Sequence, residues 1–172
     1  YSSINIFILS LESTKISNFM SSNVKTSQLT RPLFQICQIM KNNNIGSLIV
    51  VNESDFPVGI ITERDIVYCI AQEEDTLQLQ AQKIMTSPLI TIKDSNSLID
   101  ALQIMHSHNF RRLPVINNEQ KLIGIITDKD IIKSILSSKD LLSDYYDKEE
   151  FEPSYSILEE FRDRIFDTLY KP

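Results

Sequence analysis

The stretch GIITERDI at residues 59–66 recurs as GIITDKDI at residues 124–131. The two octapeptides differ at two positions only, and each difference exchanges residues of like charge. The same step of 65 residues, without a gap, relates further pairs of identical residues along both copies. These pairs include Met20 and Met85, Thr26 and Thr91, Leu33 and Leu98, Met40 and Met105, Asn44 and Asn109, Leu48 and Leu113, and Asn52 and Asn117. A collinear series of this kind indicates an internal repeat, which decides how the rest of the chain is interpreted.

The repeat sets the expected domain organisation of the 172-residue chain. One copy is too small to bury its own sheet face, so the two copies are expected to pack together. The expected segments are an N-terminal apolar extension (1–13), unit 1 (14–72), a linker (73–79), unit 2 (80–138), and an acidic connector with a C-terminal amphipathic helix (139–172).

Each copy predicts the element order β-α-β-β-α. A short extended piece (24–26 or 89–92) precedes an amphipathic helix with an apolar stripe at helical spacing, expected over 32–43 and 97–108. Pro32 suits the first turn of the first helix, and Ser95 or Ser97 offers an N-cap for the second. Two β-rich runs joined by polar hairpin connectors follow (48–51 with 58–62, and 113–116 with 122–127), and a second helix then begins at Glu63 or Asp128.

Composition excludes several classes of partner. Hydrophobic residues make up 42% of the chain and the formal charge is −6 at pH 7, which disfavours a nucleic acid or an anionic membrane as the main partner. The apolar stretch Ile4–Leu11 is too short to span a bilayer and lacks the features of a signal peptide. The two cysteines, Cys37 and Cys69, have no paired spacing, which predicts buried, reduced thiols in a cytoplasmic protein.

The sequence resembles a tandem pair of cystathionine β-synthase (CBS) domains, or Bateman module, of the prokaryotic stand-alone kind. The resemblance covers both repeats and rests on MTSP at 85–88, FRRLPV at 110–115 and the duplicated Gly-Ile-Ile-Thr-x-x-Asp. It implies an α/β (α+β) fold in which two units pack sheet to sheet about a pseudo-twofold axis. It also implies clefts that bind AMP, ADP, ATP or S-adenosylmethionine, and assembly into a homodimer.

The duplicated motif contains the main candidate residues for nucleotide binding. Thr62 and Thr127 stand where a strand runs into a helix, and unpaired N–H groups with the positive end of the helix favour phosphate there. Asp65 and Asp130 follow one turn later, where a carboxylate can accept hydrogen bonds from ribose hydroxyls. The family resemblance implies the same roles. The alternative is a capping box at each helix start, and both interpretations can hold together.

Further candidates surround these four residues. Arg111 and Arg112 stand in the second repeat where the first has Gly46 and Ser47, and arginine suits phosphate oxygens. The second cleft is therefore expected to be the better phosphate site. Arg64 and Lys129 add positive charge beside the aspartates, or else belong to a solvated helix face. Resemblance to the family places the base near Thr26, Thr91 and Ile92, with core packing as the alternative; Ile90 and Ile125 are further adenine-facing candidates.

No catalytic or metal-binding arrangement is apparent, so neither an enzyme nor a bound cofactor is expected. His106 and His108 are two residues apart on a helix and face different directions. The chain has no Gly-rich phosphate loop and no nucleophile elbow. Both ends of the chain carry apolar stripes, which either close the pair's own core or serve a dimer interface or an effector protein.

Three functions follow from the sequence. The first is a regulatory module that senses an adenine nucleotide or S-adenosylmethionine and signals to an effector protein. The second is an interaction or oligomerisation module with empty clefts. The third is the regulatory fragment of a longer enzyme or transporter, because CBS pairs also sit within inosine monophosphate dehydrogenases and chloride channels.

Overall fold

The computed structural model describes residues 2–72 and 76–137. Contacts divide the chain into two compact units. The sheet unit comprises 21–94 and 113–125, and the helical unit comprises the described parts of 1–20, 95–112 and 126–172. The limits of the two sequence repeats remain a prediction.

The first sheet of the sheet unit has the strand order β1-β2-β3. Its strands are β1 (Thr26–Gln28), β2 (Ser47–Val51) and β3 (Pro57–Thr62). β2 runs parallel to β1 and antiparallel to β3. Every residue of β2 is buried, as its central position and its Leu-Ile-Val-Val run lead us to expect.

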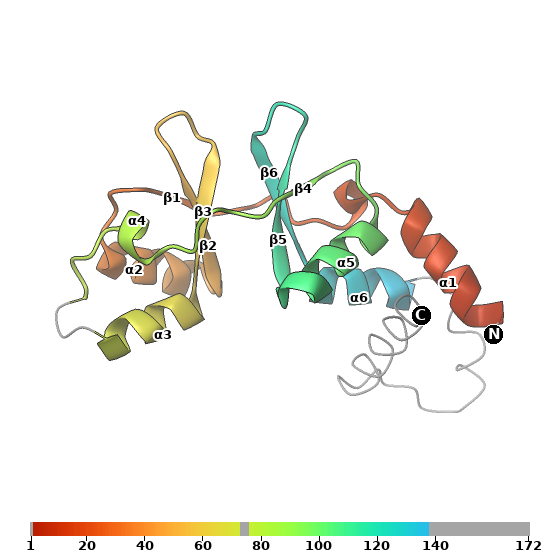
Figure 1. Ribbon diagram of the computed structural model, residues 1–172, viewed down its shortest axis with the longest axis horizontal. Coiled ribbons are helices and arrows are strands. Elements are labelled where there is room, and N and C mark those ends of the chain that lie inside the picture. Colours follow the sequence, from red (N-terminus) through yellow and green to blue (C-terminus); the bar gives the residue numbers. More distant parts are fainter. Residues whose placement is uncertain (1, 73–75, 138–172) are drawn as a thin grey trace. The chain divides into compact units, whose positions relative to one another are not determined.

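Helices α2 (Leu33–Asn43), α3 (Glu63–Gln72) and α4 (Ala81–Ile84) lie on one side of this sheet (Figure 1). The core between these layers is apolar, which gives the burial that drives folding. Its buried members are Leu33, Ile36, Met40, Leu48, Val50, Ile61 and Ala81. The helix α3 adds no fully buried residue of its own.

The second sheet has the order β4-β5-β6. It consists of β4 (Ile92–Lys93), β5 (Arg112–Ile116) and β6 (Leu122–Thr127), with β4 parallel to β5. The connectors before β3 and β6 fold in the same way. The side-chain oxygens of Asn52 and Asn117 each accept hydrogen bonds from two backbone N–H groups, at 2.9–3.0 Å. Such asparagine turns explain why the repeat keeps this residue type at both positions.

The helical unit contains α1 (Ser2–Ser13), a short 3-10 helix (Ile16–Asn18), α5 (Leu98–His108) and α6 (Asp128–Ser137). Helix α1 packs against α5, and α5 packs against α6. The Leu98 N–H donates to the Thr14 carbonyl at 3.0 Å, and the Ile16 N–H donates to the Asn96 carbonyl at 2.9 Å. Leu11 is buried, so the N-terminal extension packs on its own fold.

Helix α5 starts with a capping box. The Ser97 hydroxyl accepts a hydrogen bond from the Asp100 N–H, and the Asp100 carboxylate accepts one from the Ser97 N–H. Burial acts to raise the pKa of Asp100, but hydrogen bonds from the Ser97 backbone, the Asn96 side chain and the Ser97 hydroxyl outweigh it and lower the pKa. Of the two predicted N-caps, the structure uses Ser97.

The predicted two-repeat β-α-β-β-α order is confirmed, while several boundaries differ. Pro32 is the N-cap of α2 rather than part of its first turn. The first strands begin later than predicted, at 26–28 and 92–93, and the second of them is also shorter, because pairing with the buried strands β2 and β5 selects which residues are extended. The C-terminal connector and its predicted helix lie outside the described residues.

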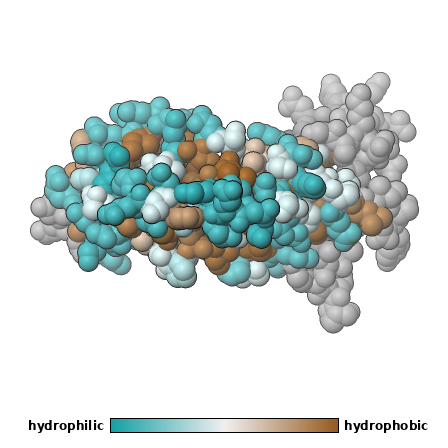
Figure 2. Space-filling model, turned by 90° about the horizontal axis from the view of Figure 1, so that it is seen from above, coloured by the Kyte–Doolittle hydropathy of each residue, from teal (hydrophilic) through white to brown (hydrophobic). Residues whose placement is uncertain are grey.

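The exterior is mainly hydrophilic on the face that Figure 2 shows, with hydrophobic patches between the polar side chains. Scattered apolar surface is normal for a folded protein. None of the helices in residues 2–72 and 76–137 is long and apolar enough to cross a membrane.

Candidate ligand site

In the first repeat, Thr62 ends β3 and Asp65 lies in the first turn of α3. The Thr62 N–H and the Thr62 hydroxyl both donate to Asp65 Oδ2, each at 2.7 Å. The Asp65 N–H donates back to Thr62 Oγ1 at 3.3 Å. The arrangement is the capping box that the sequence offered as the alternative interpretation. It uses one carboxylate oxygen of Asp65 and leaves the other to a further donor.

The second repeat has the same arrangement within the helical unit. The Thr127 N–H and hydroxyl donate to Asp130 Oδ2 at 2.9 and 2.7 Å, and the Asp130 N–H donates to Thr127 Oγ1 at 3.2 Å. Both aspartates are half-buried. The capping bonds fix each carboxylate beside the free N–H groups of a helix start, which is a favourable environment for an anionic or hydroxyl-bearing ligand.

A segment that sequence reasoning did not assign to the site lies along β3. Thr86 and Ile60 exchange backbone hydrogen bonds at 2.8 and 3.1 Å. The Thr86 hydroxyl donates to Asp65 Oδ1 at 3.2 Å, and the Ser87 hydroxyl donates to the Val58 carbonyl at 3.0 Å. The signal in the sequence that could have identified this segment is the 65-residue step of the repeat, which aligns Thr86 with Ser21. Ser21 likewise exchanges backbone hydrogen bonds with Ile125, at 2.9 Å.

Gly59 allows this close approach. A Cβ added at Gly59 would lie 2.5 Å from Met85 Sδ, 2.9 Å from Met85 Cγ and 3.1 Å from the Thr86 carbonyl oxygen. These distances are shorter than ordinary contacts, so with a side chain at this position the Met85 side chain would have to turn away and the backbone at Thr86 would have to shift slightly. The repeated glycine therefore has a packing role in the first repeat, beside the hairpin chemistry considered from the sequence.

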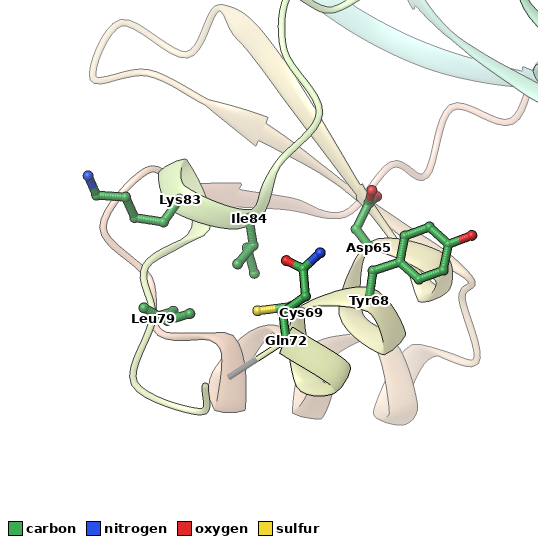
Figure 3. Close-up of a pocket in the computed structure, with 7 residues that line it drawn as sticks. All are labelled: Asp65, Tyr68, Cys69, Gln72, Leu79, Lys83 and Ile84. Atoms are coloured by element: carbon green, nitrogen blue, oxygen red, sulfur yellow. The ribbon is translucent and has the colours of Figure 1, made fainter. Parts of the chain in front are cut away.

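A pocket of about 490 Å³ adjoins Asp65 on the side of α4. Figure 3 shows Cys69 and Gln72 of α3 near Ile84 at its centre, Asp65 and Tyr68 at one end, and Leu79 and Lys83 at the other. The Lys83 side chain extends away from α3. Pockets of this volume are large enough for a small molecule. Apart from Asp65, sequence reasoning identified none of its lining residues.

Arg111 lies at the start of the second helix of its repeat. Its carbonyl oxygen accepts a hydrogen bond from the Asp128 N–H at 3.0 Å, and its side chain is exposed. Arg112 begins β5 and is half-buried. Lys129 and Arg64 are exposed on the first turns of α6 and α3, so each helix start has a basic side chain beside its acidic residues.

The residues proposed to hold a base have different environments. Thr26 is exposed at the start of β1, where it is in register with Ile49. Thr91 is half-buried, and Ile92 is 4% exposed. The burial of Ile92 favours the alternative of a core residue, since little of its surface remains for a ligand.

Cys37 and Cys69 form no disulfide, and both are half-buried rather than buried as the sequence predicted. Burial raises the pKa of the Cys37 thiol, opposed in part by a backbone hydrogen bond. Among the described residues, no group of three or more histidine, cysteine, aspartate or glutamate side chains is placed to hold a metal ion.

Comparison with known proteins identifies the family. The model of the CBS domain family matches residues 16–72 and 81–142. The chain therefore belongs to the CBS domain family, and it carries two such domains in tandem. The chain is 35% identical over 124 residues to an uncharacterized protein of Methanopyrus kandleri, an alignment that covers 72% of this chain and 63% of that protein. The chain thus spans less than two thirds of that relative's length.

Two solved structures of CBS proteins have the same fold as this chain. The crystal structure of CBSX2 in complex with AMP has a TM-score of 0.67 at 23% identity, covering 74% of this chain and 99% of that one. At this identity the likeness shows the fold alone. The CBS domain pair of protein MJ0100, in complex with 5′-methylthioadenosine and S-adenosyl-L-methionine, has a TM-score of 0.66 at 26% identity, covering 73% of this chain and 98% of that one.

Proposed function

We propose that this CBS pair is a regulatory module that binds an adenine nucleotide or S-adenosylmethionine and passes the signal to an effector protein. The observation that carries the proposal is the duplicated Thr–Asp constellation, Thr62 with Asp65 and Thr127 with Asp130. A capping box alone would not require the same hydroxyl and carboxylate at both helix starts. The ligands of the two solved CBS structures support the adenosyl class.

Each part of such a ligand has a matching group. The carboxylates of Asp65 and Asp130 accept hydrogen bonds from ribose hydroxyls. The N-termini of α3 and α6, with Arg111 beside α6, favour phosphate. Thr26 and Thr91 remain proposed contacts of the base. We propose binding rather than catalysis, in the cytoplasm, where reduced thiols persist.

The ligand acts by changing the balance between two states of the module. It can do so only if its affinity for the two states differs. The effector protein is unidentified, and a longer chain with an enzyme or transporter part remains an alternative.

A thermal-shift screen tests this proposal. AMP, ADP, ATP, NAD and S-adenosylmethionine are each added to the purified chain. A true ligand stabilises the folded state by about 2.7 kcal/mol at one hundred times its dissociation constant, so the melting temperature should rise by several degrees. Guanosine monophosphate serves as the matched control. No rise with any adenosyl compound would overturn the proposal.

The exposed face of α3 favours assembly as a second function. Val67, Tyr68 and Ile70 are 61%, 59% and 54% exposed. Val67 and Ile70 are three residues apart and so lie next to each other on the helix surface, and exposed apolar surface of this kind marks an interaction site. The family resemblance implies a homodimer, and a homodimer formed through α3 would bury this surface.

Replacing Ile70 with aspartate should then convert a dimer into a monomer, because the new charge would have to be buried at the interface. Sedimentation velocity measures the change, and Lys133→Asp, on the exposed surface of α6, is a control. A wild-type chain that is monomeric at micromolar concentration would exclude this homodimer.

A further inference from the structure

We infer that the Thr86 hydroxyl acts as an internal competitor for the ligand at Asp65, which weakens the first site relative to the second. This inference rests on the proposed function and names a residue that regulates one of its two sites. It concerns the oxygen Asp65 Oδ1, which the capping box leaves unused.

The two oxygens of the Asp65 carboxylate are the acceptors for which Thr62, Thr86 and the ligand compete. Asp65 Oδ2 accepts two hydrogen bonds from Thr62, so a ligand's hydroxyls must bind mainly at Oδ1. Thr86 Oγ1 already donates to Oδ1 at 3.2 Å. A ligand hydroxyl that binds at Oδ1 must therefore displace the Thr86 hydroxyl or share the acceptor with it.

Backbone contacts fix the position of Thr86. Two backbone hydrogen bonds to Ile60 hold the residue on β3, and Gly59 leaves room for it. The Ser87 hydroxyl fixes the next residue to Val58. Threonine is also β-branched, so its side chain has few rotamers by which to turn away from Asp65.

The second repeat shows the same carboxylate without this contact. Asp130 Oδ2 is bonded to Thr127 in the same way. Within residues 2–72 and 76–137, no hydrogen bond to Asp130 Oδ1 is found. The residue at the position of Thr86 is Ser21, one repeat earlier. The two sites therefore differ in whether the ribose acceptor is already occupied, independently of the arginines that distinguish them for phosphate.

The test removes the hydroxyl and keeps the shape. Thr86→Val is made in an Asp130→Asn background, in which the second site is weakened, and the probe is adenosine, which has ribose hydroxyls and no phosphate. Losing one competing hydrogen bond should tighten adenosine binding by roughly threefold to tenfold, measured by calorimetry. With 2′,3′-dideoxyadenosine, which cannot donate to Asp65, the same substitution should leave the affinity unchanged. Ser21→Ala is the matched control and should change neither affinity.

A ligand-free measurement accompanies the binding test. Thr86→Val, Asp65→Asn and the double variant are unfolded in urea, and the two substitutions should be non-additive because the side chains interact in the free protein. Additive effects overturn the inference, as does adenosine binding that is unchanged or weaker in Thr86→Val, or an equal gain with the dideoxy compound. If no protein binds any adenosyl compound, the proposed function itself fails. If the wild type binds and Thr86→Val brings no gain, only the role of Thr86 fails.

Discussion

Replacing Asp130 with asparagine is expected to weaken AMP binding by about tenfold to one hundredfold, because hydrogen bonds to a charged group contribute about 1.5–3 kcal/mol. The same substitution at Asp65 should weaken AMP binding less. Two features favour the second site: Arg111 lies beside the start of α6, and Asp130 Oδ1 does not share the Thr86 contact that Asp65 has. Isothermal calorimetry on the two single variants measures the difference.

Asparagine is preferred to alanine because it separates ligand contact from capping. An amide oxygen can still accept the hydrogen bonds from Thr127, so the helix start is kept while the charge is lost. Loss of a cap costs about 1 kcal/mol. Urea unfolding of both variants is the control. Equal losses of affinity in the two variants would contradict the prediction that the two sites differ. Unchanged affinity in both would show that the two aspartates cap their helices and do not bind the ligand.

Replacing Ile131 with alanine should lower the free energy of unfolding by about 2–5 kcal/mol. Ile131 on α6 is 0% exposed, and α6 packs against α5, so the substitution leaves a cavity. Its repeat partner Ile66 on α3 is only partly buried against the first core. Ile66→Ala should therefore cost about half as much or less, since part of its side chain already contacts water.

Urea unfolding at one protein concentration compares the two variants. Both sites hold the same residue one position after the repeated aspartate, which makes each the matched control of the other. Both substitutions are made in an Ile70→Asp background, so that a dimer through α3 does not cover Ile66. A larger loss for Ile66 than for Ile131 in that background would contradict the prediction.

Much of the fold could be predicted because it depends on local patterns that occur twice. The change from alternating to helical periodicity at Thr62 and Thr127 defines the strand-to-helix junctions, and Asn52 and Asn117 define the hairpin turns. The strands β1 and β4 were placed less well. They are short and take their extended form from pairing with β2 and β5, which a sequence pattern does not show.

The candidate site was predicted in part. Thr62 and Asp65 are three residues apart on one chain segment, and so are Thr127 and Asp130, so a pattern can connect each pair. Thr86 is 21 residues from Asp65, and only the path of the chain along β3 brings the two side chains together. The lining of the pocket beside α4 was missed for the same reason, since Leu79 and Lys83 reach it through the linker after α3.

The octapeptide at residues 59–66, repeated at residues 124–131, determined the family, the order of the elements and the paired Thr–Asp constellation. These depend on residue type and spacing, and the two copies share both. The tertiary structure decided how the copies differ. Identical or similar residues, such as Ile66 and Ile131 or Asp65 and Asp130, have different burial and different hydrogen bonds. The physical reason is that burial and acceptor occupancy depend on what packs against a residue, and those neighbours come from distant parts of the chain.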